Sequence, residues 1–348
     1  MNGFGLVFSG GGGKGAYEIG VWKYLHEIGM DNYVKAVSGT SVGALNAALF
    51  TGSSYEQAEE MWMNINQSKI LSPKKIKPED IANWLIKNGL NIASVVTMGV
   101  SKVASAGVWT ISKLAEMILT KAKGDHLFSR EGLSEMIEES INIDMLNNND
   151  IPCFVTCVKC PGFKIERFKL NEYLYEEALT ILLASSAIPI VFPNELFHGQ
   201  KYCDGGIPLV GDNTPIQPIY YYGVDNIIVV HLNRETVIDR SQYPDSNIIE
   251  IVPSIELGNA MNGTLDFSAS GAKQRIDVGY EDAKKVLQPM LEMLVMSFKN
   301  QLSLEELKAR LNQFEIEKSA LKAKESEIKE QMANDGFDEV VGNIKVEE

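Results

Sequence analysis

Residues 33–45 read Tyr-Val-Lys-Ala-Val-Ser-Gly-Thr-Ser-Val-Gly-Ala-Leu, and this stretch decides the fold. Its first part, Tyr33 to Val37, is a largely apolar run of the kind that forms a strand. The run breaks at Ser38-Gly39, and a helical pattern of apolar residues begins near Ser41. The sequence therefore predicts a strand that passes through a tight turn directly into a helix.

The same arrangement precedes this stretch. Residues 5–8 form a short apolar run, which ends in Ser9 and the four glycines Gly10 to Gly13, and helical periodicity starts at Ala16. The first 50 residues thus alternate strand, turn and helix twice. Such alternation is typical of the α/β class, in which helices cover a mostly parallel sheet.

The remaining elements follow the same pattern. Residues 55–140 carry few strand signals and are predicted to be mostly helical, and further helices are expected at 174–186 and 270–298. Further strands are predicted at 152–158, 164–168, 226–232 and 248–252.

Composition excludes several classes of protein. A net charge of −14 over 348 residues would repel a nucleic acid polymer, so no such partner is expected. No secretory signal is visible after Met1, and no run of 18 apolar residues could span a membrane. Four cysteines are too few for a disulfide framework. We expect a cytoplasmic protein with reduced cysteines.

The turn at Gly39-Thr40-Ser41-Val42-Gly43 matches Gly-x-Ser-x-Gly, the pattern of a nucleophile elbow. Its glycines permit a sharp bend between strand and helix, which leaves the serine hydroxyl exposed. The helix that starts behind Ser41 also favours developing negative charge. A serine nucleophile needs a base to accept its proton.

The earlier turn, Gly10 to Gly15, exposes several backbone N–H groups at a helix N-terminus, where a phosphate or an oxyanion is stabilised. It fails the Walker pattern because Gly15 follows Lys14. It matches Gly-x-Gly-x-x-Gly, but the next strand ends in Val37-Ser38-Gly39 instead of an acidic residue. A nucleotide- or phosphate-binding module, with Ser41 as a helix cap, therefore stays open as an alternative function.

Asp204-Gly205-Gly206 offers a carboxylate on a turn where bare backbone leaves room for a substrate. Taken alone, Asp-Gly is a common turn pair. A triad of Ser41, Asp204 and His231 has the chain order of α/β-hydrolases, but His231 ends a predicted buried strand, where a histidine is more often structural.

Taken together, these three glycine motifs resemble those of the patatin-like phospholipases. Residues 184–189 (Ala-Ser-Ser-Ala-Ile-Pro), Phe192-Pro193 and 213–215 (Asn-Thr-Pro) also fit, and the resemblance spans roughly residues 4–232. It implies a three-layer α/β/α fold, no cofactor or metal, and hydrolysis of fatty-acyl esters, of the phospholipase A or lysophospholipase type. Because some bacterial relatives are ligand-activated effectors that degrade membranes, that role is a further alternative.

The resemblance also implies roles for individual residues. Ser41 would be the nucleophile, Asp204 the general base, and the N–H groups of Gly11, Gly12 and Gly13 the oxyanion hole, without a histidine. Lys14 lies where the family loop varies or carries arginine, and it is expected to fix the loop or attract a lipid phosphate. Supporting motif positions are Gly10, Lys14, Gly15, Gly39, Gly43, Gly205 and Gly206.

Residues 69–123 contain nine lysines and three acidic residues, and their second half is rich in small and apolar residues. A basic, apolar segment of this kind suits an anionic membrane surface, so peripheral membrane contact is expected if the substrate is a phospholipid. A helical cap with an apolar core face is an equally admissible interpretation, and the segment could also form a lid over Ser41.

Positions 307, 311, 314, 318, 321, 325, 328 and 332 step by fours and threes, and six of these eight are apolar. The stripe predicts either self-association through 304–332 or one amphipathic helix packed on the catalytic domain. We predict a catalytic domain over 1–300, with 69–123 as an insertion, and a helix and tail over 301–348. Cys153, Cys157 and Cys160 lack the second pair of a zinc site, so no metal is expected.

Overall fold

The computed structural model describes residues 3–65, 70, 129–189 and 192–334. Most of the predicted insertion at 69–123 and the tail beyond Asn334 therefore lie outside the described residues. The strands are β1 (Phe4–Phe8), β2 (Val34–Thr40), β3 (Cys153–Cys160), β4 (Lys164–Lys169), β5 (Glu195–Phe197), β6 (Gln200–Asp204), β7 (Asn226–Val230) and β8 (Asn247–Ile251). The α-helices are α1 (Ala16–Glu27), α2 (Val42–Gly52), α3 (Tyr55–Met63), α8 (Glu131–Ser140), α9 (Ile143–Asn147), α10 (Tyr175–Ser185), α11 (Gln217–Tyr221) and α12 (Ala269–Asn334).

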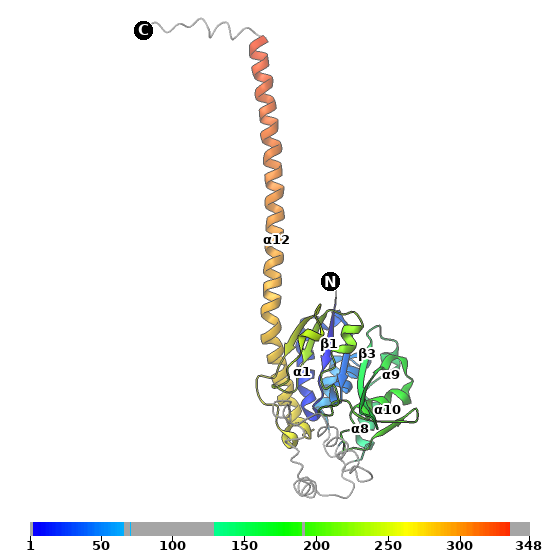
Figure 1. Cartoon of the computed structure of the whole chain (residues 1–348). Helices are drawn as coiled ribbons and strands as arrows, with labels where there is room; N and C mark the ends of the chain where they lie inside the picture. Colours follow the sequence, from blue (N-terminus) through cyan, green and yellow to red (C-terminus); the bar gives the residue numbers. More distant parts are fainter. Residues whose placement is uncertain (1–2, 66–69, 71–128, 190–191, 335–348) are drawn as a thin grey trace. The chain divides into compact units, whose positions relative to one another are not determined.

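The strands form one eight-stranded mixed sheet in the order β5-β6-β3-β2-β1-β7-β8, with β4 paired to β3. The five neighbours from β3 to β8 run parallel to one another. Strands β4, β5 and β6 join antiparallel at the β3 end of the sheet. Helices lie on both sides of the sheet (Figure 1), so the predicted α/β fold is confirmed.

The central strands are apolar because both of their faces are covered. All five residues of β1 are buried. Val7, Ala36 and Val229 alternate onto one face, where they pack against Ile216 and Ile219 at the start of α11. On the sheet, α2 packs along β1, β2 and β3. This covering of both faces is what a parallel sheet requires.

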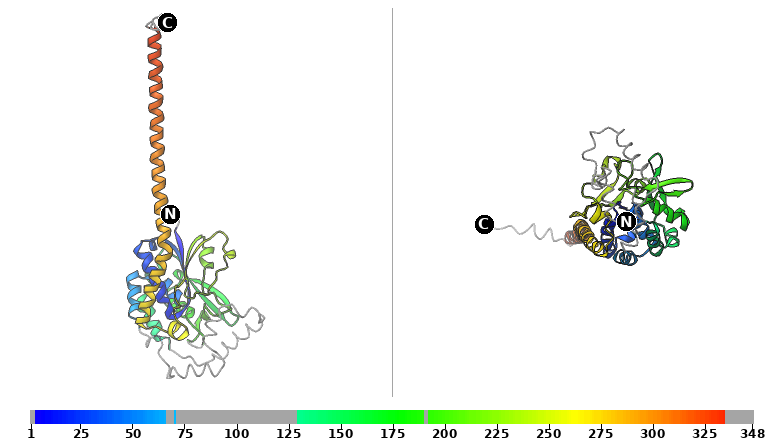
Figure 2. Two further views of the ribbon diagram at one scale, coloured as in Figure 1. Left: turned by 90° about the vertical axis from the view of Figure 1, so that its left-hand side faces the viewer. Right: turned by 90° about the horizontal axis from the view of Figure 1, so that it is seen from below.

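The chain divides into two compact units, residues 1–286 and 287–348. One continuous helix, α12, spans 66 residues and includes Pro289 (Figure 2). The helix predicted at 270–298 and the stripe predicted after 304 are therefore parts of a single helix. The predicted domain boundary near residue 300 stays a prediction.

The cysteines differ from the expectation of four free thiols. Cys153 and Cys157 are free and buried in β3, as their spacing on one strand suggests. Cys160 and Cys203, however, form a disulfide between β3 and β6. The prediction was wrong for this pair because β6, whose pairing puts Cys203 opposite Val158, was not recognised in the sequence.

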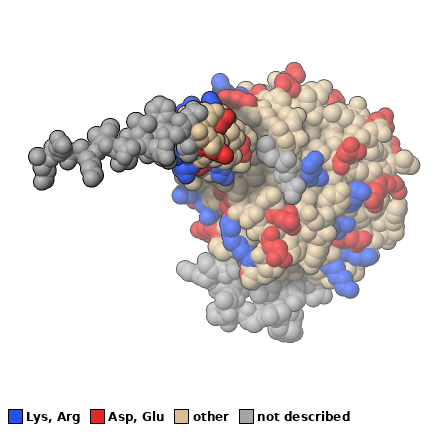
Figure 3. Space-filling view, turned by 90° about the horizontal axis from the view of Figure 1, so that it is seen from above, with Lys and Arg blue, Asp and Glu red and all other residues tan. Residues whose placement is uncertain are grey.

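On the face seen in Figure 3, acidic and basic side chains of the described residues are interspersed. In the described part of the chain, no helix combines the length and the apolar content needed to cross a bilayer.

Candidate active site

Ser41 lies between the end of β2 and the start of α2, at a sharp turn of the backbone. Its φ of 56° and ψ of −123° are unusual for a residue with a side chain, and such strain is typical of a nucleophile elbow. The turn is tight enough that a Cβ on Gly43 would overlap the carbonyl oxygen of Phe8 at the end of β1. The second glycine of Gly-x-Ser-x-Gly is thus required by the close approach of α2 to β1.

The backbone of Ser41 is anchored by Ser185, which belongs to the Ala-Ser-Ser-Ala-Ile-Pro stretch of residues 184–189. The Ser41 N–H donates to Ser185 Oγ at 2.9 Å, and Ser185 Oγ in turn donates to the Thr156 carbonyl at 2.7 Å. Ser185 ends α10 and Thr156 lies in β3. This chain of bonds ties the strained turn to the centre of the sheet.

The register of β3 brings the predicted nucleophile and base together. Thr40, the residue before Ser41, pairs with Thr156 of β3. Asp204, the last residue of β6, pairs with the next position, Cys157. Strand β4 pairs along one edge of β3, so β2 and β6 both pair along the opposite edge. On that edge, Asp204 of β6 comes directly after Thr40, the last residue of β2. Ser41 and Asp204 therefore meet across a distance of 163 positions in sequence.

Asp204 is only 5% exposed, and its two carboxylate oxygens differ. Oδ1 accepts a hydrogen bond of 2.7 Å from the Gly206 N–H, whereas Oδ2 is buried and has no hydrogen bond of normal geometry to the described residues. Burial raises the Asp204 pKa to about 6, against the lowering effects of the Ser41 hydroxyl, the Gly206 N–H and the charge of Arg130. The Asp204 carboxyl is thus held at Oδ1 by the Gly206 N–H and lies close enough to the Ser41 hydroxyl for that hydroxyl to lower its pKa.

Arg130, at the start of α8, is the cation whose charge acts on Asp204. Its guanidinium donates to the Leu183 carbonyl at 2.6 Å and pairs with Glu195 at 3.2 Å. Burial is the main cause that lowers the Arg130 pKa, to about 10, so the side chain stays charged at neutral pH. No sequence motif distinguished Arg130, because its environment is made by α10 and β5.

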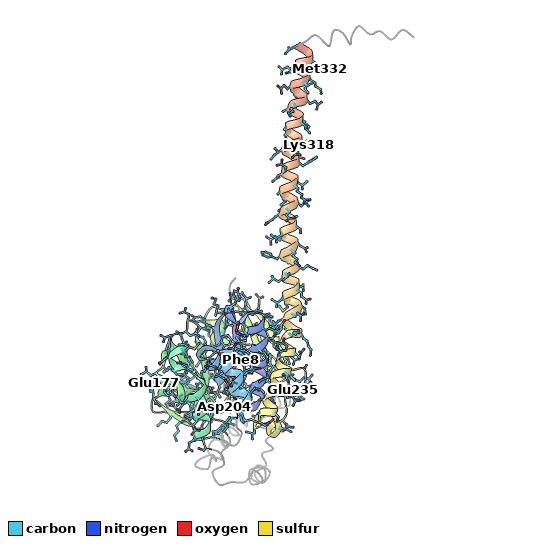
Figure 4. The ribbon with its side chains drawn as sticks, turned by 180° about the vertical axis from the view of Figure 1, so that it is seen from behind. Phe8, Glu177, Asp204, Glu235, Lys318 and Met332 are labelled. Carbon is cyan, nitrogen blue, oxygen red and sulfur yellow. A yellow bond between two sulfur atoms is a disulfide. The ribbon has the colours of Figure 1, made fainter. Side chains whose placement is uncertain are left out.

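The glycine loop starts at the end of β1, where Figure 4 labels Phe8; the same view labels Asp204. Gly10 and Asn213 hold each other: the Gly10 N–H donates to the Asn213 carbonyl, and Asn213 Nδ2 donates to the Gly10 carbonyl, both at 3.0 Å. The Ser9 and Thr214 hydroxyls are 3.1 Å apart. The Asn-Thr-Pro stretch therefore fixes the position where the glycine loop begins.

Beyond Gly10 the loop becomes a 3-10 turn, Gly12–Gly15, that leads into α1. The Lys14 N–H donates to the Gly11 carbonyl. Within the described residues, no acceptor is found for the N–H groups of Gly11, Gly12 and Gly13. The first N–H groups of a helix lack intrahelical partners, and a turn of this kind is suited to bind an anion.

The glycine loop, the serine elbow and the Asp-Gly-Gly turn all lie in a segment that matches a known family. A family model described as patatin-like phospholipase matches residues 6–220, which is more than half of the chain. The chain belongs to the patatin-like phospholipase family. A search of curated proteins gave no significant match.

The solved structures that the chain resembles include VipD and ExoU. VipD from Legionella pneumophila has 15% identity and a TM-score of 0.49, over 83% of this chain and 67% of that one. The type III effector protein ExoU has 18% identity and a TM-score of 0.42, over 83% and 53%. The structure of full-length SpcU in complex with full-length ExoU from Pseudomonas aeruginosa has 16% identity and a TM-score of 0.36, over 82% and 53%. This chain spans about half the length of the ExoU chains.

The glycine loop itself lies within the patatin-like family match, but it packs against a segment beyond residue 220. Arg275 of α12 is 6% exposed and donates to the Gly13 carbonyl at 3.3 Å. It also pairs with Asp266 at 2.7 Å and donates to the Asn262 carbonyl at 2.8 Å. A Cβ on Gly13 would overlap the Asp266 carbonyl, so the loop around 262–266 packs directly on the glycines.

Lys14 lies beside the same segment. Burial lowers its pKa, the charge of Glu256 raises it, and the charge of Arg275 lowers it further. No sequence pattern pointed to the 257–275 region, because its contacts with the glycine loop join residues more than 240 positions apart.

His231 does not complete a triad in this patatin-like chain. Its side chain is fully buried, and Nε2 lies 3.0 Å from Glu250 of β8. Asp204 lies on the opposite side of β1 and β2 in the strand order. Burial lowers the His231 pKa, partly offset by Glu250. The histidine is thus a structural partner of Glu250, and the described residues contain no cluster of His, Cys, Asp and Glu suited to a metal.

Proposed function

We propose that this chain is a serine hydrolase that cleaves fatty-acyl esters of lipids with a Ser41–Asp204 dyad. Membership of the patatin-like phospholipase family supports lipid ester hydrolysis. The observation that carries the finer proposal is the buried Asp204 carboxylate, whose raised pKa is lowered in part by a hydrogen bond with the Ser41 hydroxyl. A dyad of this kind needs no histidine, because the carboxylate itself accepts the serine proton.

In the first half of the reaction, ionised Asp204 takes the Ser41 proton as Oγ attacks the ester carbonyl carbon. The carbonyl oxygen becomes an oxyanion, which the N–H groups of Gly11, Gly12 and Gly13 stabilise. The tetrahedral intermediate then breaks its bond to the alcohol, which leaves with the proton from Asp204. The fatty-acyl group stays on Ser41 as an ester.

In the second half, Asp204 accepts a proton from water while the water oxygen attacks the acyl-enzyme. The same N–H groups stabilise the second oxyanion, and collapse releases the fatty acid and returns the proton to Ser41. The buried site favours these steps because N–H dipoles act more strongly where water is excluded. A phospholipid or lysophospholipid surface is the proposed substrate, and residues 69–123 are the proposed membrane contact.

The test is release of free fatty acid from mixed phospholipid vesicles, with a soluble nitrophenyl ester in parallel. We expect Ser41→Ala and Asp204→Asn each to lower kcat/KM by roughly 10³-fold or more. Ser319→Ala and Asp225→Asn, at exposed positions, serve as matched controls and should keep full activity. Hydrolysis that persists in Ser41→Ala would contradict the dyad. Nucleotide binding with no ester hydrolysis would favour a binding module instead.

A further inference from the structure

The second unit of the chain exposes a regular apolar stripe. Between residues 304 and 332 of α12, eight large apolar side chains are about half exposed or more. Seven of them fall on one seam with steps of three and four, and only Ile316 lies elsewhere. The seam residues are Leu304, Leu307, Leu311, Phe314, Leu321, Ile328 and Met332.

A repeat of 3.5 residues is the signature of a left-handed coiled coil, in which the a and d positions face a partner helix. Leu304, Leu311, Lys318, Glu325 and Met332 occupy a, and the other seam residues occupy d. A single helix in water gains little from such a seam, since most helical stability in proteins comes from packing an apolar face. The seam therefore calls for a partner helix.

The flanking charges identify the partner. Arg310 and Glu317 occupy g positions, and Glu315 and Lys322 occupy e positions. In a parallel pair in register, each g residue faces the e residue of the next heptad on the other helix. Arg310 then faces Glu315, and Glu317 faces Lys322, each twice by symmetry. We propose that residues 304–332 pair with the same residues of a second copy in a parallel, in-register coiled coil.

The two charges inside the seam help to set the register. Lys318 pairs with Glu315 at 3.5 Å, and Glu325 pairs with Lys329 at 2.7 Å, each within its own helix (Figure 4 labels Lys318). A charged a position costs stability but fixes register and number of strands. Sliding one copy by a heptad would place Arg310 against Lys322, which is repulsive. In the chosen register, Lys324 and Lys329 are the one repulsive pair among the e and g positions between residues 303 and 329, and at the a positions Lys318 and Glu325 each face the same residue of the second copy.

The antiparallel alternative packs the seam less well. With Leu311 placed opposite Phe314, Leu307 would face Lys318, and Ile328 would face Ser297. In the parallel register every apolar seam residue instead faces its own copy. Parallel pairing thus buries seven uniformly apolar layers between residues 304 and 332.

The first measurement is the mass of the full chain in solution by light scattering. We expect twice 38.5 kDa for the wild type. Leu311→Ser with Phe314→Ser should give the monomer mass, whereas the outward-facing pair Ala309→Ser with Ala320→Ser should stay dimeric. Circular dichroism checks that all variants fold. A monomeric or trimeric wild type, or a dimer that survives loss of the seam, would overturn the proposal.

The second measurement tests orientation. Arg310→Glu should weaken the dimer by roughly tenfold, since it turns two attractive pairs into repulsive ones. Adding Glu315→Arg should restore the affinity in a parallel pair. In an antiparallel pair it should weaken the affinity further, because the new positive charge at position 315 would face Lys308. A Met332→Cys variant should form a disulfide-linked dimer on oxidation only if the helices are parallel. Failure of both the restoration and the cross-link would exclude the parallel arrangement.

Discussion

In the proposed dyad, Asp204 is a buried acid that would serve as the base near neutral pH. Desolvation raises its pKa to about 6, while the Gly206 N–H and the charge of Arg130 limit the rise. An ordinary aspartate would be a weak base, and a more deeply desolvated one would be protonated at pH 7. The surroundings of Asp204 therefore balance base strength against the fraction of ionised carboxylate.

This balance predicts the pH dependence of hydrolysis. Protonated Asp204 cannot accept the Ser41 proton, so activity should be full above pH 7 and half-maximal near pH 6. Below that pH it should fall about tenfold per unit. The measurement is kcat/KM for a soluble ester between pH 4.5 and 8.5, corrected for stability at each pH. A flat profile across pH 6 would contradict the assignment of Asp204 as the base.

Arg130 provides the companion test. Its positive charge favours the ionised form of Asp204, so Arg130→Gln should move the midpoint of the profile to higher pH, whereas Arg130→Lys should move it less. The readout is the midpoint and not the maximal rate, because loss of the Leu183 and Glu195 contacts can lower the rate by loosening the site. An unchanged midpoint in Arg130→Gln would show that the charge of Arg130 does not affect the pKa of Asp204.

Glu18 is a second buried acid, behind the glycine loop, and the proposed reaction does not use it. It is fully buried, and Oε2 accepts from Asn46 at 2.7 Å, while Oε1 has no hydrogen bond to the described residues. Burial raises its pKa well above 4.5, opposed by Asn46 and the Ser9 backbone. The folded state thus holds a proton that the unfolded chain releases above pH 4.5.

It follows that wild-type stability decreases as pH rises above 4.5 through the raised pKa of Glu18. Glu18→Gln, which keeps the shape and the acceptor without the charge, should remove this part of the pH dependence. The free energy of unfolding of the variant minus that of the wild type should therefore be more positive at pH 8 than at pH 4.5. Urea unfolding at the two pH values measures the difference, and equal differences at both would contradict a neutral Glu18.

At the scale of elements, the sequence predicted those parts whose signals are local. The strand–turn–helix units around Gly10 and Ser41 are marked by glycines and apolar runs within a few residues, and β1, β2, α1 and α2 appear where they were expected. Strand β6 was missed, because Lys201-Tyr202-Cys203 has no strong pattern and becomes a strand through pairing with β3. The Asp-Gly-Gly motif predicted a role for Asp204, but its position next to Ser41 follows from the pairing of β6 with β3.

The role of Arg275 could not be predicted from the sequence, because it too depends on a contact between distant residues. Its importance arises from a contact with Gly13, 262 residues earlier in the chain. A buried arginine that binds four carbonyls and one carboxylate holds a loop in place rather than touching the substrate. The proposed oxyanion hole is therefore supported from α12, which begins beyond the family match.

This support gives a prediction for Arg275 as a positioning residue. Arg275→Lys keeps the charge but cannot make the forked contacts with Asp266 and Asn262, so the glycine loop should shift. We expect kcat for a soluble ester to fall roughly tenfold with little change in KM, since the loop acts on the transition state. Gln274→Ala, at the exposed neighbouring position, is the matched control. A fall in stability with kcat unchanged would mean that the contact is only structural.

At the scale of the whole molecule, the proposed active site and the proposed dimerisation seam lie in different units of the chain. All residues of the proposed site lie in the unit 1–286, and the apolar seam lies in the unit 287–348. We therefore expect Leu311→Ser with Phe314→Ser to leave kcat/KM for a soluble ester within about twofold of wild type. Activity on vesicles is measured alongside, and a loss on both substrates would show that the seam is needed for the chemistry itself.

The register of β3 has a consequence for how such a protein can diversify. Thr40 and Asp204 are aligned to neighbouring positions of one strand, and the segments that connect them to β3 enter neither pairing. The parts of those connections that contain none of Ser41, Arg130 and Ser185 can be lengthened, exchanged or rebuilt without altering the spacing of the two proposed reacting groups. Substrate preference and membrane targeting are then free to evolve in the connections, while the chemistry is inherited unchanged.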